Sequence, residues 1–207
     1  MSFELWLAFA AASSLLLVIP GPTVLLVLSY ALGRGWKAAL PMAGGVAAGD
    51  LTAMTLSMLG VGALLATSAT LFTALKWVGA LYLIWLGVKL WRSGDRREAE
   101  PRDDAASPMR MFGHAWLVTT LNPKSILFFV AFVPQFLDPS RSFAAQAVVM
   151  IATFVGLGFI NALAFAFVGV RARDFVQSPR AMRFVNRTGG AALIGAGATT
   201  AAFGRAA

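Results

Sequence analysis

Long apolar segments alternate with short polar ones along almost the whole chain. A bilayer core about 30 Å thick needs about 20 apolar residues in a helix that crosses it, and six stretches reach that length. They cover about residues 5–30, 40–65, 69–91, 112–133, 144–170 and 185–204. The longest polar segment, residues 92–110, divides these stretches three and three. The pattern predicts an all-α integral membrane protein with six transmembrane helices.

The composition supports a membrane protein and excludes several other classes. Apolar residues make up 58% of the chain and charged residues 13%, whereas soluble chains contain about 25% charged residues. The net charge of +8 lies in short segments between apolar stretches, so we expect no nucleic-acid partner. There is no cysteine, which excludes disulfides and thiolate metal sites. No metal-ligand cluster or phosphate-binding loop is found, and we expect no cofactor.

The distribution of Lys and Arg predicts the orientation in the membrane. Thirteen of these residues lie in segments on one side, at 34–37, 89–110 and 171–187, and two, Arg141 and Arg205, lie on the other. Positively charged residues favour cytoplasmic loops, so both termini are expected outside the cytoplasm. Glu4 and the lack of Lys or Arg before the first apolar stretch argue against a signal peptide, and we expect that stretch to be a retained span.

Two of the predicted spans are interrupted near their middle. Pro20, Gly21 and Pro22 interrupt the first, and Asn122 with Pro123 interrupts the fourth. Proline inside a helix costs about 3 kcal/mol. A break leaves backbone groups that lipid cannot satisfy, so it must lie inside the protein or beside a polar cavity. Two matched breaks therefore predict one central polar site, and the alternative is a pair of structural kinks.

The two halves of the chain resemble each other. "IPGPTVLLVL" corresponds to "LNPKSILFFV", and "KWVGALYLIWLG" (76–87) corresponds to "NRTGGAALIGAG" (186–197). Three spans in each half require the second copy to be inverted, as in many secondary transporters with interrupted helices. We expect one transmembrane transporter domain, 1–207, with repeat 1 at about 1–91, a cytoplasmic loop at about 92–111 and repeat 2 at about 112–207.

These motifs resemble those of the LysE/RhtB family of amino acid exporters. Besides the paired segments above, the matching pieces are "IPGP" at 19–22, "GGVAAGD" at 44–50 and "LNPKSILFFVAFVPQFLDP" at 121–139. The resemblance covers the chain apart from its central loop. It implies efflux of amino acids or close derivatives across the bacterial inner membrane, driven by proton antiport. The family exports basic amino acids or neutral ones such as threonine, homoserine and leucine, and no motif distinguishes these branches.

Asp50 is the only carboxylate within a predicted span. An ionisable residue at that depth is costly and is functional by default. We expect it to load and release a proton or to hold a substrate ammonium group. The alternative is a structural partner for Lys124 or for a broken backbone.

The other polar residues of the spans lie near the second break or at a comparable depth. Lys124 has three possible roles, which are to hold a substrate carboxylate, to neutralise Asp50 or to cap broken carbonyls. Asn122 is expected to cap the half-helix that begins at the break. Asn161 is expected to bond to a neighbouring helix, with lining of the cavity as the alternative.

Two other classes of function compete with export. A single intramembrane carboxylate is too little for a membrane-embedded enzyme that catalyses hydrolysis. A scaffold protein would not explain why the two helices break at matched positions. We therefore expect a transporter without enzyme activity, whose partners are an amino acid, protons and membrane lipid. Faces of small residues permit a homodimer without requiring one.

Overall fold

The computed structural model describes residues 1–67, 107–138 and 140–171, with scattered positions between 77 and 92 and between 180 and 198. This part of the chain is helical and contains no strand. The third and sixth predicted spans, and with them the paired segments 76–87 and 186–197, lie largely outside the described residues. The six-span inverted repeat stays a prediction.

The first broken helix consists of α1 (Phe3–Val18) and α2 (Pro22–Arg34). Ile19 has extended backbone angles, φ −68° and ψ 121°, because a residue before proline is disfavoured in the α conformation. Pro22 then occupies the first turn of α2, where its missing N–H costs no helical hydrogen bond. The predicted break at residues 20–22 is confirmed.

The second broken helix consists of α5 (Pro108–Thr120) and α6 (Pro123–Leu127). Ser107 caps α5 by accepting a hydrogen bond from the Arg110 N–H, so the helix begins within the last residues of the predicted 92–111 loop. After α6 the backbone becomes a π-helix, η2 (Phe128–Phe132), and then a 3-10 helix, η3 (Val133–Phe136). The halves meet at 42°, which confirms the second break.

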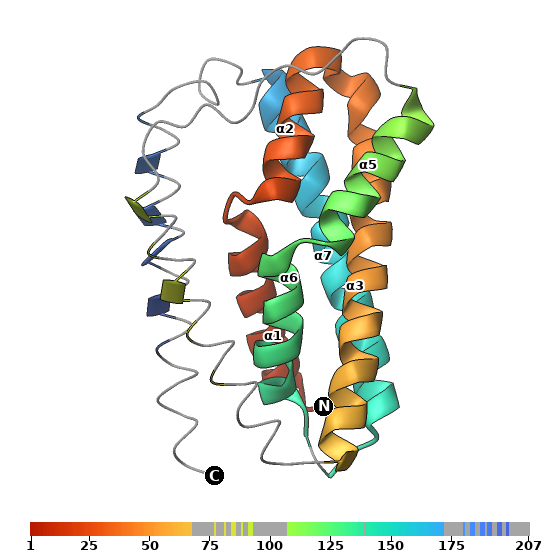
Figure 1. The fold of residues 1–207 in the computed structure, drawn as a ribbon, viewed down its shortest axis with the longest axis vertical. Helices are drawn as coiled ribbons and strands as arrows, with labels where there is room; N and C mark the ends of the chain where they lie inside the picture. Colours follow the sequence, from red (N-terminus) through yellow and green to blue (C-terminus); the bar gives the residue numbers. More distant parts are fainter. Residues whose placement is uncertain are drawn as a thin grey trace.

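The remaining described elements are η1 (Gly35–Ala38), α3 (Ala39–Thr67) and α7 (Phe143–Arg171). Within the described residues, Pro22–Gly60 and Phe143–Arg171 are long and apolar enough to cross a membrane, and the bent α5–η3 pair is a third candidate. Figure 1 shows α1 and α2 rising from the N-terminus, whereas α5 and α6 descend. The two broken helices therefore run in opposite directions.

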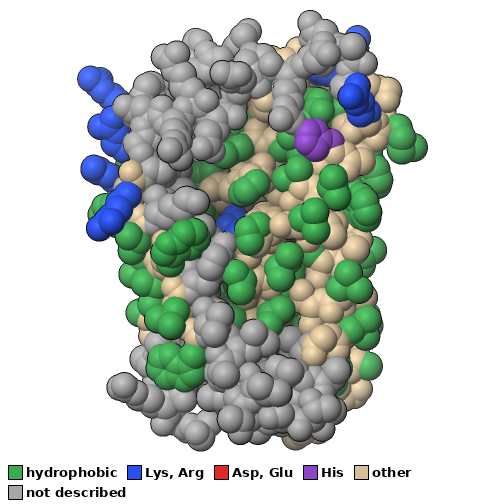
Figure 2. Space-filling view, in the orientation of Figure 1, with side chains coloured by type: hydrophobic (Ala, Val, Ile, Leu, Met, Phe, Trp, Pro, Cys, Tyr) green, Lys and Arg blue, Asp and Glu red, His purple; other side chains and the backbone are tan. Residues whose placement is uncertain are grey.

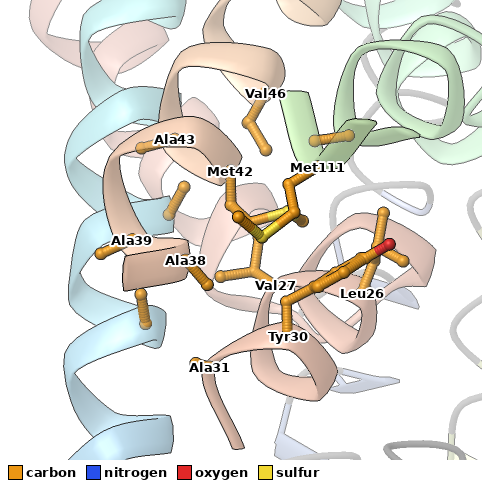
Figure 3. Close-up of a cluster of buried hydrophobic side chains, with 13 residues drawn as sticks. Leu26, Val27, Tyr30, Ala31, Ala38, Ala39, Met42, Ala43, Val46 and Met111 are labelled. Atoms are coloured by element: carbon orange, nitrogen blue, oxygen red, sulfur yellow. The ribbon is translucent and has the colours of Figure 1, made fainter. Parts of the chain in front are cut away.

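Two groups of buried side chains fill the interior on either side of the breaks. The aromatic cluster comprises Phe9, Leu16, Ile19, Ala53, Met54, Met58, Phe128, Phe129, Val133, Ala147, Met150 and Phe154. The small-residue cluster comprises Leu26, Val27, Tyr30, Ala31, Ala38, Ala39, Met42, Ala43, Val46, Met111, Ala115, Ala162 and Ala166 (Figure 3). The first joins the lower parts of the helices in Figure 1, and the second joins their upper parts.

Helices α3 and α5 pack closely because glycines face the contact. A Cβ atom at Gly49 would lie 2.6 Å from Thr119 Cβ and 2.8 Å from the Trp116 carbonyl oxygen. A Cβ atom at Gly45 would lie 2.8 Å from Ala115 Cβ. The 44–50 segment therefore allows close approach of α3 and α5, as small residues do between membrane helices.

Large apolar side chains cover much of the outside. They include Leu7, Leu40, Leu56, Val148 and Ile160. Figure 2 shows hydrophobic side chains spread over one face, with Lys and Arg side chains near the upper end and along the upper part of one edge. An apolar exterior of this kind is suited to contact with lipid rather than water.

Candidate functional site

One cavity lies where the two breaks meet α3 and α7. Of the residues that the sequence predicted, Gly21, Asp50, Asn122, Lys124 and Asn161 line it, whereas Pro20, Pro22 and Pro123 lie in the breaks without lining it. The remaining lining residues are Leu17, Thr23, Val24, Val27, Val46, Ser125, Gly158, Ala162 and Phe165. The cavity volume is about 20 Å³, which is room for about one water molecule.

Lys124 caps the carbonyl end of α1. Its buried Nζ donates hydrogen bonds to the Leu16 and Ile19 carbonyl oxygens, at 3.0 and 2.8 Å. Asn161, from α7, donates to the Leu17 carbonyl oxygen at 3.1 Å. These are carbonyls that a broken helix leaves without partners. Of the three roles considered for Lys124, the structure shows capping, and it shows that Asn161 both lines the cavity and bonds to a neighbouring helix.

Asn122 joins the two breaks through its side chain. Its Oδ1 accepts a hydrogen bond from the Lys124 backbone N–H at 3.1 Å, which confirms the predicted cap of α6. Its Nδ2 donates to Thr23 Oγ1 at 3.2 Å, and that hydroxyl lies 3.3 Å from Thr119 Oγ1. The first turn of α2 is thereby tied to the end of α5 and the start of α6.

Asp50 reaches the cavity from α3 and is almost fully buried, with 1% of its surface exposed. Among the residues that the structure describes, none forms a hydrogen bond with its Oδ2. In the ranges that the structure describes, the only direct ion pair joins Arg141 to Asp138 at 3.2 Å. Lys124 and Asp50 attract each other across the cavity without direct contact. A buried carboxylate oxygen is thus left unsatisfied beside the breaks, and such a group calls for an explanation in ligand or proton binding.

The start of α2 offers a second, oppositely charged end to the cavity. Gly21 is the N-cap and supplies no side-chain hydrogen bond, and Pro22 has no N–H. The next two residues, Thr23 and Val24, belong to the first helical turn and line the cavity. Free N–H groups and the positive end of the helix dipole suit an anion. Helix α6 differs, because Asn122 already caps it.

Sequence reasoning did not single out Thr23, Ser125 or Gly158. Thr23 and Ser125 each lie within two residues of a break proline, so their proximity to the breaks was an available signal. Gly158 lies three residues before Asn161, and residues at that spacing share a helix face. A Cβ atom at Gly158 would overlap Asp50 Oδ2, so glycine is needed there for the carboxylate to fit.

Replacing Gly158 with alanine is expected to reduce substrate binding sharply, because the added methyl group must displace the Asp50 carboxylate. Gly156→Ala is the matched control, since a Cβ atom there meets nothing within 4 Å. Substrate affinity of both purified variants would be measured by titration calorimetry. Equal, wild-type affinity in both would show that the position of Asp50 does not matter for binding.

Comparison with known proteins agrees with the resemblance found in the sequence. The chain is 30% identical over 201 residues to a homoserine/homoserine lactone efflux protein of Salmonella typhimurium, covering 97% of this chain and 98% of that protein. It is 36% identical over 150 residues to a leucine efflux protein of an Enterobacter species, covering 72% and 71%. It is 32% identical over 197 residues to an uncharacterized membrane protein of Vibrio cholerae, covering 95% and 96%.

No solved structure shows significant similarity to the chain. The family model described as LysE type translocator matches residues 14–202. This match includes both breaks and every residue that lines the cavity. The chain belongs to the LysE type translocator family.

Proposed function

We propose that this membrane protein exports neutral amino acids, or close derivatives of them, from the cytoplasm in exchange for protons. The observation that carries the proposal is the meeting of two helix breaks and an unpaired buried carboxylate at one cavity. Relatives named for efflux of homoserine, homoserine lactone and leucine support the substrate class. They favour transport over the enzyme and scaffold alternatives.

The cavity provides complementary groups for the two ends of a zwitterion. The substrate carboxylate binds at the uncapped start of α2, where the Gly21 position lies beside Lys124: a Cβ atom there would be 3.4 Å from Nζ. The substrate ammonium group binds Asp50, whose Oδ2 is unpaired. A proton that replaces the ammonium group on Asp50 then couples the two fluxes. Antiport follows because one carboxylate serves both cations in turn.

Transport requires the site to open. A cavity of about 20 Å³ holds about one water molecule and is too small for an amino acid. A bound amino acid therefore needs more room than the described cavity provides. Asp50 and Lys124 are both buried in it, with 1% and 6% of their surfaces exposed, so substrate entry and exit require helices or side chains to separate.

Counterflow in reconstituted vesicles tests the function. Proteoliposomes loaded with one amino acid would be exposed to a trace of the same radiolabelled compound, across a panel that includes homoserine, leucine, threonine and lysine. We expect rapid exchange for one or more neutral compounds and slower exchange for lysine. Vesicles without protein give the background. The absence of exchange above that background for every compound would refute the proposal.

We further propose six spans as two inverted repeats, with both termini outside the cytoplasm. Arg34 ends α2 and Arg171 ends α7, while Lys37 lies in η1 and Arg110 in the first turn of α5. These helix ends lie at the upper end of Figure 1. Arg141, which precedes α7 and donates to the Met1 carbonyl oxygen, belongs to the opposite end. This distribution supports placing the upper end in the cytoplasm.

The orientation predicts the accessibility of single cysteines, which are simple to introduce because the chain has none. Ser140→Cys should react with a membrane-impermeant maleimide in intact cells, and Lys37→Cys should react only after permeabilisation. Both positions are exposed, so accessibility reports the side of the membrane. The reverse labelling pattern would invert the topology.

A further inference from the structure

The contacts of Lys124 identify what neutralises the negative end of broken helix α1. A helix that ends inside a membrane presents unpaired carbonyls and the negative end of its dipole. Here the Leu16 and Ile19 carbonyl oxygens converge on a single ammonium group, at 3.0 and 2.8 Å. It belongs to Lys124, a residue that is 6% exposed and comes from the other broken helix. The carbonyl end of α1 is therefore a cation site that a side chain fills.

Carbonyls at broken helix ends have another use in secondary transporters, where they coordinate sodium ions that drive transport. A lysine ammonium group donates hydrogen bonds to the same oxygens and carries the same charge, but it is tethered to the chain. Nζ binds the carbonyl oxygens of two residues that lie three positions apart in sequence, as a bound metal ion would. No room is left between the ammonium and these oxygens for a second cation.

The charges in the cavity also indicate that no metal cation is needed there. Asp50 and Lys124 line one cavity and are the ionisable side chains among its described lining residues. One carboxylate and one ammonium group sum to zero when both are ionised, so no metal ion is needed to neutralise Asp50.

We propose that Lys124 is a built-in replacement for a coupling metal cation at the carbonyl end of α1, so that neither folding nor transport of this protein depends on sodium. The inference deepens the proposed amino acid export and, for transport, rests on it. An ammonium group has three N–H donors, and the α1 carbonyls take two of them. The third is available to a substrate carboxylate at the start of α2.

Chemical rescue of a lysine-free variant tests the role of the cation. Wild type, Lys124→Ala, Lys124→Met and Lys37→Ala would be purified, and thermal unfolding would be followed in choline, sodium and ethylammonium chloride at equal ionic strength. We expect Lys124→Ala to unfold about 5 °C below wild type in choline and to regain that loss in ethylammonium. The unfolding temperature of Lys124→Met should stay below that of wild type in all three salts, because the methionine side chain fills the space without a charge.

Wild type and Lys37→Ala serve as controls for the Lys124 variants. Lys37 is exposed on η1, so Lys37→Ala and wild type should unfold at one temperature in all three salts. Sodium stabilisation of wild type, or wild-type stability of Lys124→Ala in choline, would overturn the proposal. The proposal would also be overturned if Lys124→Ala did not recover, or did not fold, in ethylammonium while Lys37→Ala folds. That result would mean that the α1 carbonyls require the covalently attached lysine side chain and not simply a cation.

Transport provides an independent measurement. Counterflow by wild-type vesicles should proceed at the same rate when choline replaces sodium on both sides of the membrane. A rate that requires sodium would overturn the proposal even if the unfolding results agree with it. If wild type exchanges no amino acid at all, the export function fails, while the unfolding experiments still decide whether Lys124 acts as the tethered cation.

Discussion

Asp50→Asn is expected to abolish uphill export and to weaken substrate binding by about 30-fold or more. The amide keeps the shape of the side chain but cannot exchange a proton or attract an ammonium group as a carboxylate does. Removing one member of a buried charged pair costs about 2–5 kcal/mol, and each 1.4 kcal/mol corresponds to about tenfold in affinity. Because its Oδ2 is unpaired among the described residues, Asp50 is the carboxylate available to bind the substrate ammonium group.

Two assays separate coupling from binding in this variant. Accumulation of substrate in everted vesicles under an imposed proton gradient reports coupling, and calorimetric titration of purified protein reports affinity. Asp138→Asn is the control, because Asp138 lies outside the cavity after η3 and pairs with Arg141. Full uphill transport by Asp50→Asn, with an unchanged dependence on pH, would exclude Asp50 as the proton carrier.

Gly21→Leu is expected to eliminate substrate binding while the protein still folds. A Cβ atom at Gly21 would lie 3.4 Å from both Cε and Nζ of Lys124, so the outer atoms of leucine must occupy the cavity or displace the ammonium group. The backbone at Gly21 is extended, with φ −137° and ψ −173°, which any residue adopts. The loss should therefore come from the site and not from a strained backbone.

Gly21→Ala and Gly156→Leu are matched controls for this variant. Alanine stops at ordinary contact distance from Lys124, and position 156 faces open space, so both should bind substrate. Amino acid methyl esters test the same end of the site from the ligand side, since they lack the carboxylate that the start of α2 would hold. Wild-type affinity in Gly21→Leu, or esters that compete as well as free acids, would place the site elsewhere.

The breaks could be read from the sequence because their cause is local. Proline lacks an N–H and restricts the residue before it. Pro22 and Pro123 therefore each begin a new helix regardless of how the surrounding helices pack. The cap at Asn122 is equally local, since its side chain accepts a hydrogen bond from the N–H two residues further on. Family membership followed from the motifs around these same residues.

The contacts between breaks could not be read from the sequence, because they depend on how distant helices face one another. Lys124 had three possible partners, and the choice of the α1 carbonyls depends on where α6 starts relative to the end of α1. Gly158 was not recognised because glycine is common in apolar helices, and its contact with Asp50 joins α7 to α3. The π-helical turn of η2 also went unpredicted, since an apolar run gives no sign of it.

The two interior clusters give the molecule unequal mechanical properties along its length. At Gly45 and Gly49, helices α3 and α5 meet almost at the backbone. Seven of the thirteen residues of the small-residue cluster are alanine, so few side chains there can make room by rotating. The aromatic cluster contains phenylalanine and methionine next to the non-α turns of η2 and η3, and methionine adapts readily to new surroundings. Side-chain rotation therefore meets less resistance at the end that holds the aromatic cluster than at the end where the helix backbones are in close contact.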